Sequence, residues 1–207
     1  MKNIVSCGTV KEGELLDQNY WNEKWLNQKI GWDIGFVSPA IASYFKKIAD
    51  KNIRILIPGC GNAYEAEFLL EEGFTDISII DISPKACDIL NKKFKNNKEI
   101  KIFSEDFFQH EGNYDFIIEQ TFFCAIPTIN RNQYAKKTAE LLAENGKIIG
   151  LLFNRNFEQK GPPFGGSSAE YQFIFKKYFE IIKMEESVKS ISERQGMELF
   201  INLQKLT

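Results

Sequence analysis

Two glycines and an aspartate have the spacing of a nucleotide-binding half-site. Gly59 and Gly61 follow a short apolar run, and Asp81 ends a second one, twenty positions after Gly61. Glycines let a ligand approach the backbone closely, and the start of the next helix offers free N–H groups to a carboxylate or phosphate. A carboxylate after the second strand can accept both hydroxyls of a ribose. These residues therefore predict binding of an adenosine-containing ligand.

The residue that follows the glycine turn narrows the choice of ligand. Dinucleotide-binding turns carry a third small residue where this sequence has Tyr64, because helix and strand pack closely over the pyrophosphate. S-adenosylmethionine has no pyrophosphate and tolerates the larger side chain, so we expect it rather than NAD. An NAD-binding oxidoreductase and a non-catalytic nucleotide-binding protein are the alternatives, and a glycine turn that only shapes the backbone is a third.

Strand and helix patterns alternate along the chain around this half-site. Apolar runs predict strands at 53–57, 77–80, 100–104, 114–119, 146–153, 179–185 and 197–204. Helical periodicity predicts helices at 20–28, 38–51, 64–72, 84–94, 130–142 and 169–178. Such alternation predicts an α/β fold with a mostly parallel sheet, and the two strands at the end predict one antiparallel edge.

Local signals place the ends of several helices. Asp17 or Asn19 can cap the first helix, because a short polar side chain satisfies a free backbone N–H. Ser83 is expected to cap another helix, with Pro84 at its first position, where the missing N–H costs nothing. Gly73 is expected to end the helix of the half-site.

Length and charge limit the functional classes. The chain has 207 residues, which fits one domain with a full core, and no repeat or linker divides it. Its net charge of −2 provides no basic field for nucleic acid or an anionic membrane. No apolar run reaches the ~18 residues of a membrane helix, and no signal segment is evident, so we expect a cytoplasmic protein. Every apolar stripe has a place in the expected core, and we expect a monomer.

Nucleophilic and metal-binding residue types are scattered. Cys7, Cys60, Cys87 and Cys124 form no CxxC pair, and His110 is the only histidine, so we expect no zinc site. We interpret Cys60 and Cys124 as buried small residues and His110 as a solvated loop residue. The sequence therefore offers no evident nucleophile or acid–base pair.

Aromatic residues are concentrated before the first strand. Trp21, Trp25 and Trp32 are all the tryptophans of the chain and lie within twelve residues. Aromatic rings attract both adenine and a sulfonium cation, so residues 1–36 are predicted to form a cover over the ligand. Packing of the rings onto the domain is the alternative. Residues 1–19 are polar and are expected to be a loosely docked lead.

Three further segments follow expected strands, at the edge where open α/β sheets bind ligands. In 105–108, Asp106 either holds the adenine amino group or caps a helix. In 119–122, the side chains are expected to face the reactive end of a ligand. The connection 154–168 is long and rich in glycine and proline, which is typical of a lid or binding loop, with disorder as the alternative.

Several short stretches together resemble one known family. They are YWNEKW and GWDIG before the first strand, IPGCGNAYEAEFLLEEGF and IIDIS in the half-site, and EDFF, EQTFFCAIP and GPPFGG at later strand ends. From about Tyr20 onward the chain resembles the thiopurine S-methyltransferase family of class I S-adenosylmethionine methyltransferases, and more closely its thiol and halide methyltransferase branch. The resemblance implies a Rossmann-like, seven-stranded and mostly parallel sheet with an antiparallel last strand and helices on both faces.

The resemblance also implies roles for single residues. It places S-adenosylmethionine against Trp21, Trp25, Trp32, Gly59, Gly61, Asp81, Ile82, Asp106, Phe107, Glu119 and Thr121. The tryptophans would cover the cofactor, the glycines would underlie its amino acid tail, and Asp81 would bind its ribose. It places the methyl acceptor against Gln120, Phe122, Phe164 and Arg194.

The implied reaction is an in-line displacement in which a soft nucleophile takes the methyl group from the sulfonium. Such a nucleophile arrives as an anion, so its orientation and the exclusion of water matter more than an acid or base, and no metal is needed. Thiopurine enzymes typically have an arginine where this chain has Gln120, which favours the thiol and halide branch. We therefore expect a small-molecule acceptor, a thiol, sulfide or halide, rather than a thiopurine.

Overall fold

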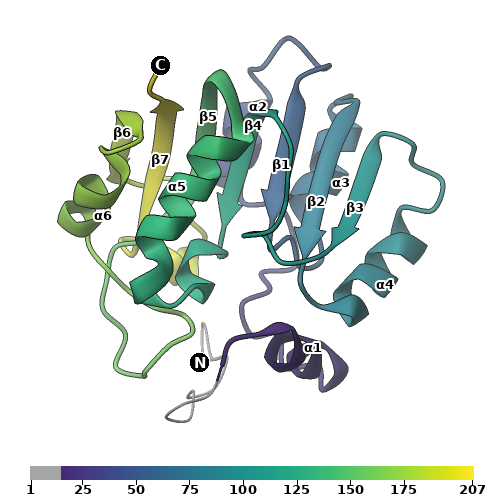
Figure 1. Ribbon diagram of the computed structural model, residues 1–207, viewed down its shortest axis with the longest axis horizontal. Helices are drawn as coiled ribbons and strands as arrows, with labels where there is room; N and C mark the ends of the chain where they lie inside the picture. The colour runs from purple at the N-terminus through teal and green to yellow at the C-terminus, as the bar shows by residue number, and fades with distance from the viewer. Residues whose placement is uncertain (1–14) are drawn as a thin grey trace.

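The computed structural model describes residues 15–207, whose strands form one sheet in the order β3-β2-β1-β4-β5-β7-β6 (Figure 1). Residues 1–14, which include Cys7, most of the expected polar lead and the start of the expected cover segment, lie outside the described residues. Within the described part, no helix is both long and apolar enough to cross a membrane.

Each strand and helix expected from the sequence is present, and the predicted order is confirmed. The strands are β1 (Arg54–Pro58), β2 (Asp76–Asp81), β3 (Ile100–Ser104), β4 (Tyr114–Gln120), β5 (Leu142–Phe153), β6 (Phe179–Glu186) and β7 (Glu198–Lys205). The helices are α1 (Gln18–Leu26), α2 (Pro39–Phe45), α3 (Tyr64–Glu71), α4 (Pro84–Lys93), α5 (Arg131–Leu141) and α6 (Ser168–Phe175). Short 3-10 turns are η1 (Phe123–Ala125), η2 (Thr128–Asn130) and η3 (Ser192–Arg194).

The sheet is parallel except for one strand. β1 lies in parallel between β2 and β4, and β3 and β5 extend the parallel part on either side. β7 runs antiparallel to both of its neighbours, β5 and β6. A parallel neighbour requires a long crossover, whereas the connection 187–197 returns the chain directly beside β6 in the opposite direction. The predicted α/β sheet with an antiparallel last strand is confirmed.

Helices cover both faces of the sheet because the central strands are apolar on both sides. On one face, α2, α3 and α4 bury Phe45, Leu69 and Leu90. On the other face, α5 and α6 bury Tyr134 and Phe175. Figure 1 shows α5 and α6 in front of the sheet and α2 and α3 behind it. Packing on both sides holds the strand ends rigidly, as a precise ligand site requires.

Two helices begin at predicted capping residues. The Asp17 carboxylate accepts the backbone N–H of Tyr20 at 3.0 Å at the start of α1. The Ser83 hydroxyl accepts the backbone N–H of Ala86 at 3.2 Å at the start of α4, and Pro84 is the first residue of that helix. Each cap satisfies a backbone donor that the helix itself leaves free.

Helix ends differ most from the sequence-based expectation. α2 ends at Phe45 rather than at residue 51, because the N–H groups of Lys47 and Ile48 bond three residues back and close the helix with a tight turn. α5 ends one residue early, since Leu142 already pairs with Tyr114 in the sheet. Pairing with a distant strand is not visible in the local periodicity on which the expectation was based.

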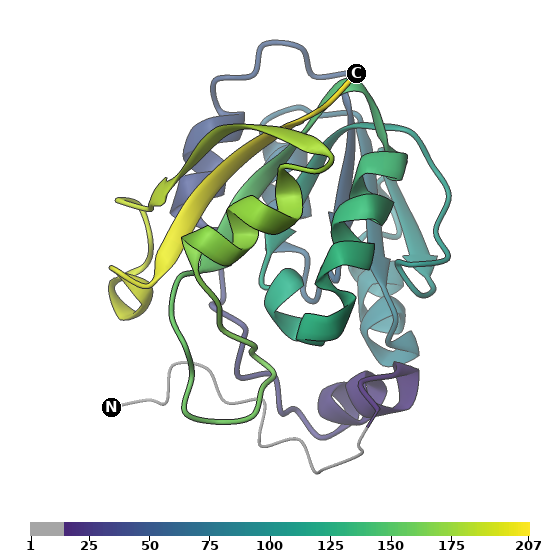
Figure 2. The same cartoon turned by 60° about the vertical axis from the view of Figure 1, so that its left-hand side comes forward.

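The carboxyl ends of the parallel strands lie at one edge of the sheet. In Figure 1 the arrowheads of β1, β2 and β3 point towards α1, which lies beyond them. In Figure 2 the connection 154–167 between β5 and α6 extends towards the same edge. The fold therefore brings α1, the strand ends and this connection together.

Candidate active site

A cavity of about 400 Å³ opens at this edge of the sheet. Small-molecule sites in proteins typically have volumes of ~300–1,000 Å³. The segment that contains α1 lines one side of the cavity, the strand ends line another, and Pro162 and Pro163 of the connection 154–167 line a third. The cavity is therefore built from segments that are far apart in the sequence.

Neighbouring strands contribute to the lining one after another along the sheet edge. Asp106 follows β3, Asp81 ends β2, Gly59 follows β1, Thr121 follows β4 and Phe153 ends β5. Strands in a sheet are ~4.8 Å apart, so these five ends extend over about 19 Å. The strand order also reverses direction between β1 and β4, which is where open α/β sheets bind ligands. An elongated ligand can therefore contact all five ends at once.

The glycine turn has the backbone conformation that its sequence predicts. Gly59 and Gly61 have φ angles of +56° and +53°, which only glycine adopts without strain. A Cβ atom on Gly59 would lie 2.2 Å from the ring of Phe122, so the turn also needs glycine for close packing. The turn thus keeps its backbone open to the cavity at the start of α3.

Asp81 lies at the cavity wall with both carboxylate oxygens engaged. Its Oδ1 accepts the backbone N–H of Ser83 at 2.9 Å, and its Oδ2 accepts the N–H of Gly61 at 3.1 Å. Each oxygen keeps a second lone pair that can accept a ligand hydroxyl. Burial raises the pKa of Asp81 to about 6, although the two N–H bonds oppose this shift. The strand end therefore holds a fixed acceptor that a donor from the ligand would complete.

The tryptophans cover the cavity as a connected group. Trp21 and Trp25 each pack edge to face on Trp32, with ring centroids 5.6 and 6.2 Å apart. All three line the cavity. The Asn22 side chain attaches α1 to the start of α4. Its Oδ1 accepts hydrogen bonds from the Ser83 hydroxyl at 3.0 Å and from the backbone N–H of Lys85 at 2.9 Å. Sequence reasoning missed Asn22, although it stands inside the YWNEKW motif.

The charged lining residues are all acidic. Among the described residues they are Asp17, Asp81, Glu105 and Asp106, and none of the lining residues is basic. A pyrophosphate would be repelled by such a lining, whereas a sulfonium or ammonium group would be attracted. The residues of the cavity therefore fit S-adenosylmethionine and do not fit a dinucleotide.

Most residues predicted for the cofactor meet in this cavity. The lining includes Trp21, Trp25, Trp32, Gly59, Gly61, Asp81, Ile82, Asp106, Phe107 and Thr121. The sequence-predicted acceptor residue Phe122 also lines it. The assignment of each residue to a part of a ligand stays a prediction.

Glu119, also predicted for the cofactor, lies behind the cavity wall. Its Oε1 accepts the backbone N–H groups of Phe122 and Phe123 at 2.9 and 2.8 Å, and its Oε2 accepts the Tyr134 hydroxyl at 2.6 Å. The side chain is 1% exposed, and burial raises its pKa to about 7. Glu119 therefore shapes the turn after β4, in which Thr121 has a φ of +59°.

The lining beyond this turn is mainly apolar, with Asn130 as a polar exception. It consists mainly of Phe122, Cys124, Ile126, Phe153, Pro162 and Pro163. We call this part the acceptor end and the part between Asp106 and Gly59 the cofactor end. Sequence reasoning named Phe122 and the GPPFGG loop but missed Phe153 and Ile126, because buried apolar residues of these types carry no sequence signal of a site.

Gln120, Phe164 and Arg194 do not line the cavity. The Arg194 guanidinium is buried and donates to the Glu198 carboxylate at 3.3 Å and to the Trp32 carbonyl at 3.1 Å. The Phe164 N–H donates to the Cys124 carbonyl at 2.7 Å, which ties its loop to the turn after β4. The Arg194 guanidinium also lies over the ring of Phe153 at 5.4 Å, so it supports two lining residues, Trp32 and Phe153, from behind.

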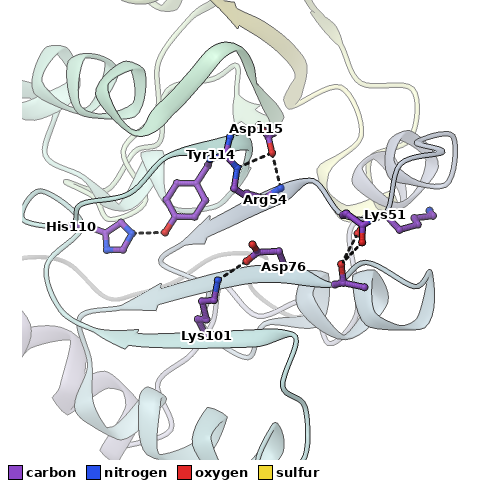
Figure 3. Close-up of polar contacts among 9 residues, drawn as sticks. Lys51, Arg54, Asp76, Lys101, His110, Tyr114 and Asp115 are labelled. Carbon is purple, nitrogen blue, oxygen red and sulfur yellow. Dashed lines mark hydrogen bonds and ion pairs between the residues drawn. The ribbon is translucent and has the colours of Figure 1, made fainter.

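His110 is not solvated, and that expectation is wrong. Its side chain is 2% exposed, and one ring nitrogen contacts the Glu105 carboxylate. The other ring nitrogen lies 2.7 Å from the Tyr114 hydroxyl (Figure 3). The rings of Phe103 and Tyr114 enclose it, which the sequence of a polar loop does not reveal. His110 does not line the cavity, although its partner Glu105 does.

Cys60 and Cys124 are buried, as the sequence predicts. Burial raises the pKa of the Cys60 thiol well above its ordinary value, which disfavours a reactive thiolate. The Cys124 thiol lies 3.2 Å from the Thr121 carbonyl. Within residues 15–207, no group of three or more histidine, cysteine or carboxylate side chains lies close enough to hold a metal ion.

Known proteins are similar to this chain along most of its length. The family model described as Thiopurine S-methyltransferase matches residues 16–202. A probable thiol methyltransferase 2 of Arabidopsis thaliana is 32% identical, and the match covers 86% of this chain and 81% of the relative. Thiocyanate methyltransferase 1 of Brassica oleracea is 28% identical, over 89% of this chain and 84% of the relative.

Solved structures share the fold at low sequence identity. Magnesium protoporphyrin IX methyltransferase from Synechocystis, with S-adenosylmethionine bound, superimposes with a TM-score of 0.73 at 14% identity and covers 91% of this chain and 95% of its own. None of these comparisons supports the oxidoreductase alternative. The chain belongs to the thiopurine S-methyltransferase family of S-adenosylmethionine-dependent methyltransferases.

Proposed function

We propose that this enzyme transfers a methyl group from S-adenosylmethionine to a small, soft nucleophile: a thiol, hydrosulfide, thiocyanate or halide. The observation that carries the proposal is the change in the cavity lining along the sheet edge. The cofactor end has carboxylates and no basic residue, and the acceptor end is mainly apolar and carries no charged residue. A cationic cofactor fits the first part, and a small, weakly hydrated acceptor fits the second.

The cofactor end offers a partner for each part of S-adenosylmethionine. Asp106 and Phe107 would hold the adenine, and Asp81 would accept the ribose hydroxyls. The Gly59–Gly61 turn and the free N–H groups at the start of α3 would receive the amino acid tail. The tryptophans would cover the sulfonium, whose positive charge is attracted to aromatic faces. When bound, the cofactor supplies a methyl group that is activated by the positive charge on sulfur.

The acceptor end can promote the reaction without an acid or base. No histidine, lysine or arginine lines the cavity in the described part of the chain. A thiolate, hydrosulfide or halide already carries its lone pair as an anion, so no proton has to be removed. Phe122, Phe153 and Pro162 would exclude water and hold the acceptor in line, which is catalysis by proximity and desolvation.

The names of two relatives support this choice of acceptor. One is named a probable thiol methyltransferase and another a thiocyanate methyltransferase. In this chain Gln120 stands where thiopurine enzymes typically carry an arginine, so a thiopurine is the less favoured acceptor. A cytoplasmic location and a monomeric state remain predictions of the sequence, which cell fractionation and size-exclusion chromatography would test.

The proposal is tested by calorimetric titration followed by a product assay. S-adenosylmethionine, S-adenosylhomocysteine and NAD are titrated in parallel, and the headspace is then analysed for methylated hydrosulfide, thiol, thiocyanate and iodide. We expect binding of the first two ligands and a volatile methylated product. Cofactor binding with 6-mercaptopurine as the only acceptor methylated would overturn the choice of acceptor. Binding of NAD alone would overturn the assignment of the cavity.

A further inference from the structure

Arg131 is a fully buried arginine beside the acceptor end. It is the first residue of α5, and its side chain is 1% exposed. Its Nη2 donates to the carbonyls of Phe164 and Gly165 at 3.2 and 2.8 Å, and its Nη1 donates to the Glu170 carboxylate at 2.7 Å. One guanidinium thus joins the start of α5, the GPPFGG loop and α6.

The position of Arg131 conflicts with local electrostatics. The first turn of a helix carries a partial positive charge, which favours an acidic residue and disfavours an arginine. Burial of a charged side chain is also costly unless it is paired and hydrogen-bonded. The two terminal nitrogens offset this cost with Glu170 and two loop carbonyls, whereas the buried Nε has no hydrogen-bond partner among the described residues. The guanidinium also packs over the rings of Phe123 and Tyr171 at 4.8 and 5.5 Å. A residue that breaks a local rule in this way commonly serves a site.

The wall made by Pro162 and Pro163 needs an external donor. Proline has no backbone N–H, so neither proline can donate a hydrogen bond to the turn after β4. The next residue, Phe164, provides one anchor through its N–H to the Cys124 carbonyl. Its carbonyl and that of Gly165 have Arg131 as their donor. The guanidinium therefore fixes the loop within two residues of the wall of the acceptor end.

We propose that Arg131 is a positioning residue that holds the Pro162–Pro163 wall of the acceptor end and thereby sets the affinity for the methyl acceptor. The contact between this wall and the methyl acceptor rests on the proposed function. The way in which Arg131 holds the wall rests on the hydrogen bonds described above. Arg131 itself does not line the cavity and is not a catalytic residue. Its loss should affect the acceptor and leave the cofactor end unchanged.

Arg131→Lys is the informative variant. Lysine keeps the charge but has no planar fork, so it cannot serve two loop carbonyls and Glu170 together. Amide hydrogen exchange is measured by NMR at Phe164 and Gly166, whose N–H groups are bonded to the carbonyls of Cys124 and Arg155. We expect exchange at both amides to rise about tenfold or more, because the loop opens locally. Unchanged exchange at both would overturn the proposal.

The second readout separates acceptor from cofactor. In Arg131→Lys we expect the KM for hydrosulfide to rise about tenfold, because small displacements of a positioning wall strongly affect a reacting group. The Kd for S-adenosylmethionine should stay within about twofold of the wild-type value. An equal loss for both ligands would mean that Arg131 acts through general stability, which contradicts the proposal.

Two further variants keep the test decisive. Arg54→Lys is the matched control, because Arg54 also makes a forked pair, with Asp115, at the opposite end of the sheet (Figure 3). Arg54→Lys should lower the melting temperature without changing the exchange rates of the Phe164 and Gly166 amides or the KM for hydrosulfide. If Arg131→Lys does not fold, Glu170→Gln is used instead, because it keeps the arginine and weakens its ion pair. It should raise the exchange rates of the same two amides by a smaller factor. If the wild-type enzyme methylates none of the acceptors, the proposed function fails, and the exchange data alone decide the role of Arg131.

Discussion

The two ends of the cavity are built in different ways. The centre of the cofactor end comes from one continuous stretch, 54–81, whose glycine turn and Asp81 line the cavity directly, while the tryptophans and the segment after β3 complete it. The acceptor end combines the turn after β4, the end of β5 and the GPPFGG loop, whose wall residues are held from behind by buried polar groups. The first end is thus centred on a local motif, whereas the second has no such motif and depends on long-range packing.

This difference agrees with the names in this family, which specify different acceptors: thiopurine, thiol and thiocyanate. The cofactor end must match a ligand of fixed structure, so its geometry follows from strand, turn and acid spacing. The acceptor end can change when a loop or a supporting residue changes, without disturbing the cofactor. The following predictions test this division by their effect on cofactor affinity, starting with the largest.

The largest effect is expected for Asp81→Ala. Loss of the carboxylate removes the acceptors for the ribose, so the Kd for S-adenosylmethionine should rise more than tenfold, about 1.4 kcal/mol or more. Calorimetric titration measures the affinity, and circular dichroism checks the fold. Asp76→Asn is the matched control, since Asp76 is an acid at the other end of β2, where it pairs with Lys101 (Figure 3). Equal affinity of Asp81→Ala and wild type would remove Asp81 from this role.

A pH dependence of cofactor binding is the next largest effect. The pKa of Asp81 is raised to about 6, and ribose hydroxyls donate to its ionised form. As pH falls through about 6, the acid takes up a proton, and cofactor affinity should fall by at most about tenfold per pH unit. Titrations from pH 5 to 8 should show this slope in the wild type and not in Asp81→Asn. A slope that persists in Asp81→Asn would point to another group.

Trp25→Ala should weaken cofactor binding about three- to tenfold, because it removes one ring of the cover. The matched control is Phe36→Ala, which removes a ring that is 50% exposed and does not line the cavity. Titration and thermal melting are measured on both variants. If Trp25→Ala lowers only the melting temperature, the cover is packing rather than a ligand contact.

Glu119→Gln should have the smallest effect on cofactor affinity, less than about twofold, because Glu119 lies behind the acceptor end. Its effect should appear in the free energy of unfolding. The folded pKa of about 7 is above the ordinary value of 4.5, so stability should be lost as pH rises from about 4.5 to about 7, by at most ~1.4 kcal/mol per unit, and should level off above that. Urea unfolding between pH 4.5 and 8 should show this loss in the wild type relative to Glu119→Gln. If the free energy of unfolding depends on pH in the same way in both proteins, Glu119 does not have the raised pKa.

The sequence predicted the cofactor end more completely than the acceptor end. Gly59, Gly61 and Asp81 are recognisable because strand, turn and helix signals are local and have fixed spacing. Trp21 and Trp25 are recognisable as a concentration of one residue type. In the acceptor end, the sequence marked the strand end at 119–122 but did not show which of its side chains faces the cavity.

The directions in which these side chains point depend on the tertiary structure. Glu119 faces Tyr134 rather than the cavity, and the sharp turn at Thr121 brings two backbone N–H groups to its carboxylate. Arg194 pairs with Glu198 and does not line the cavity. The roles of Asn22 and Arg131 are likewise set by partners that are distant in sequence.

The succession of strands and helices along the chain, the glycine turn, the acid and the helix caps follow from the sequence alone, because backbone conformation and hydrophobic periodicity act over a few residues. The assignment of buried polar side chains to the cavity or to its support was decided only by the tertiary structure. A buried charge must find a partner, and that partner can come from any segment that the fold brings within hydrogen-bonding distance.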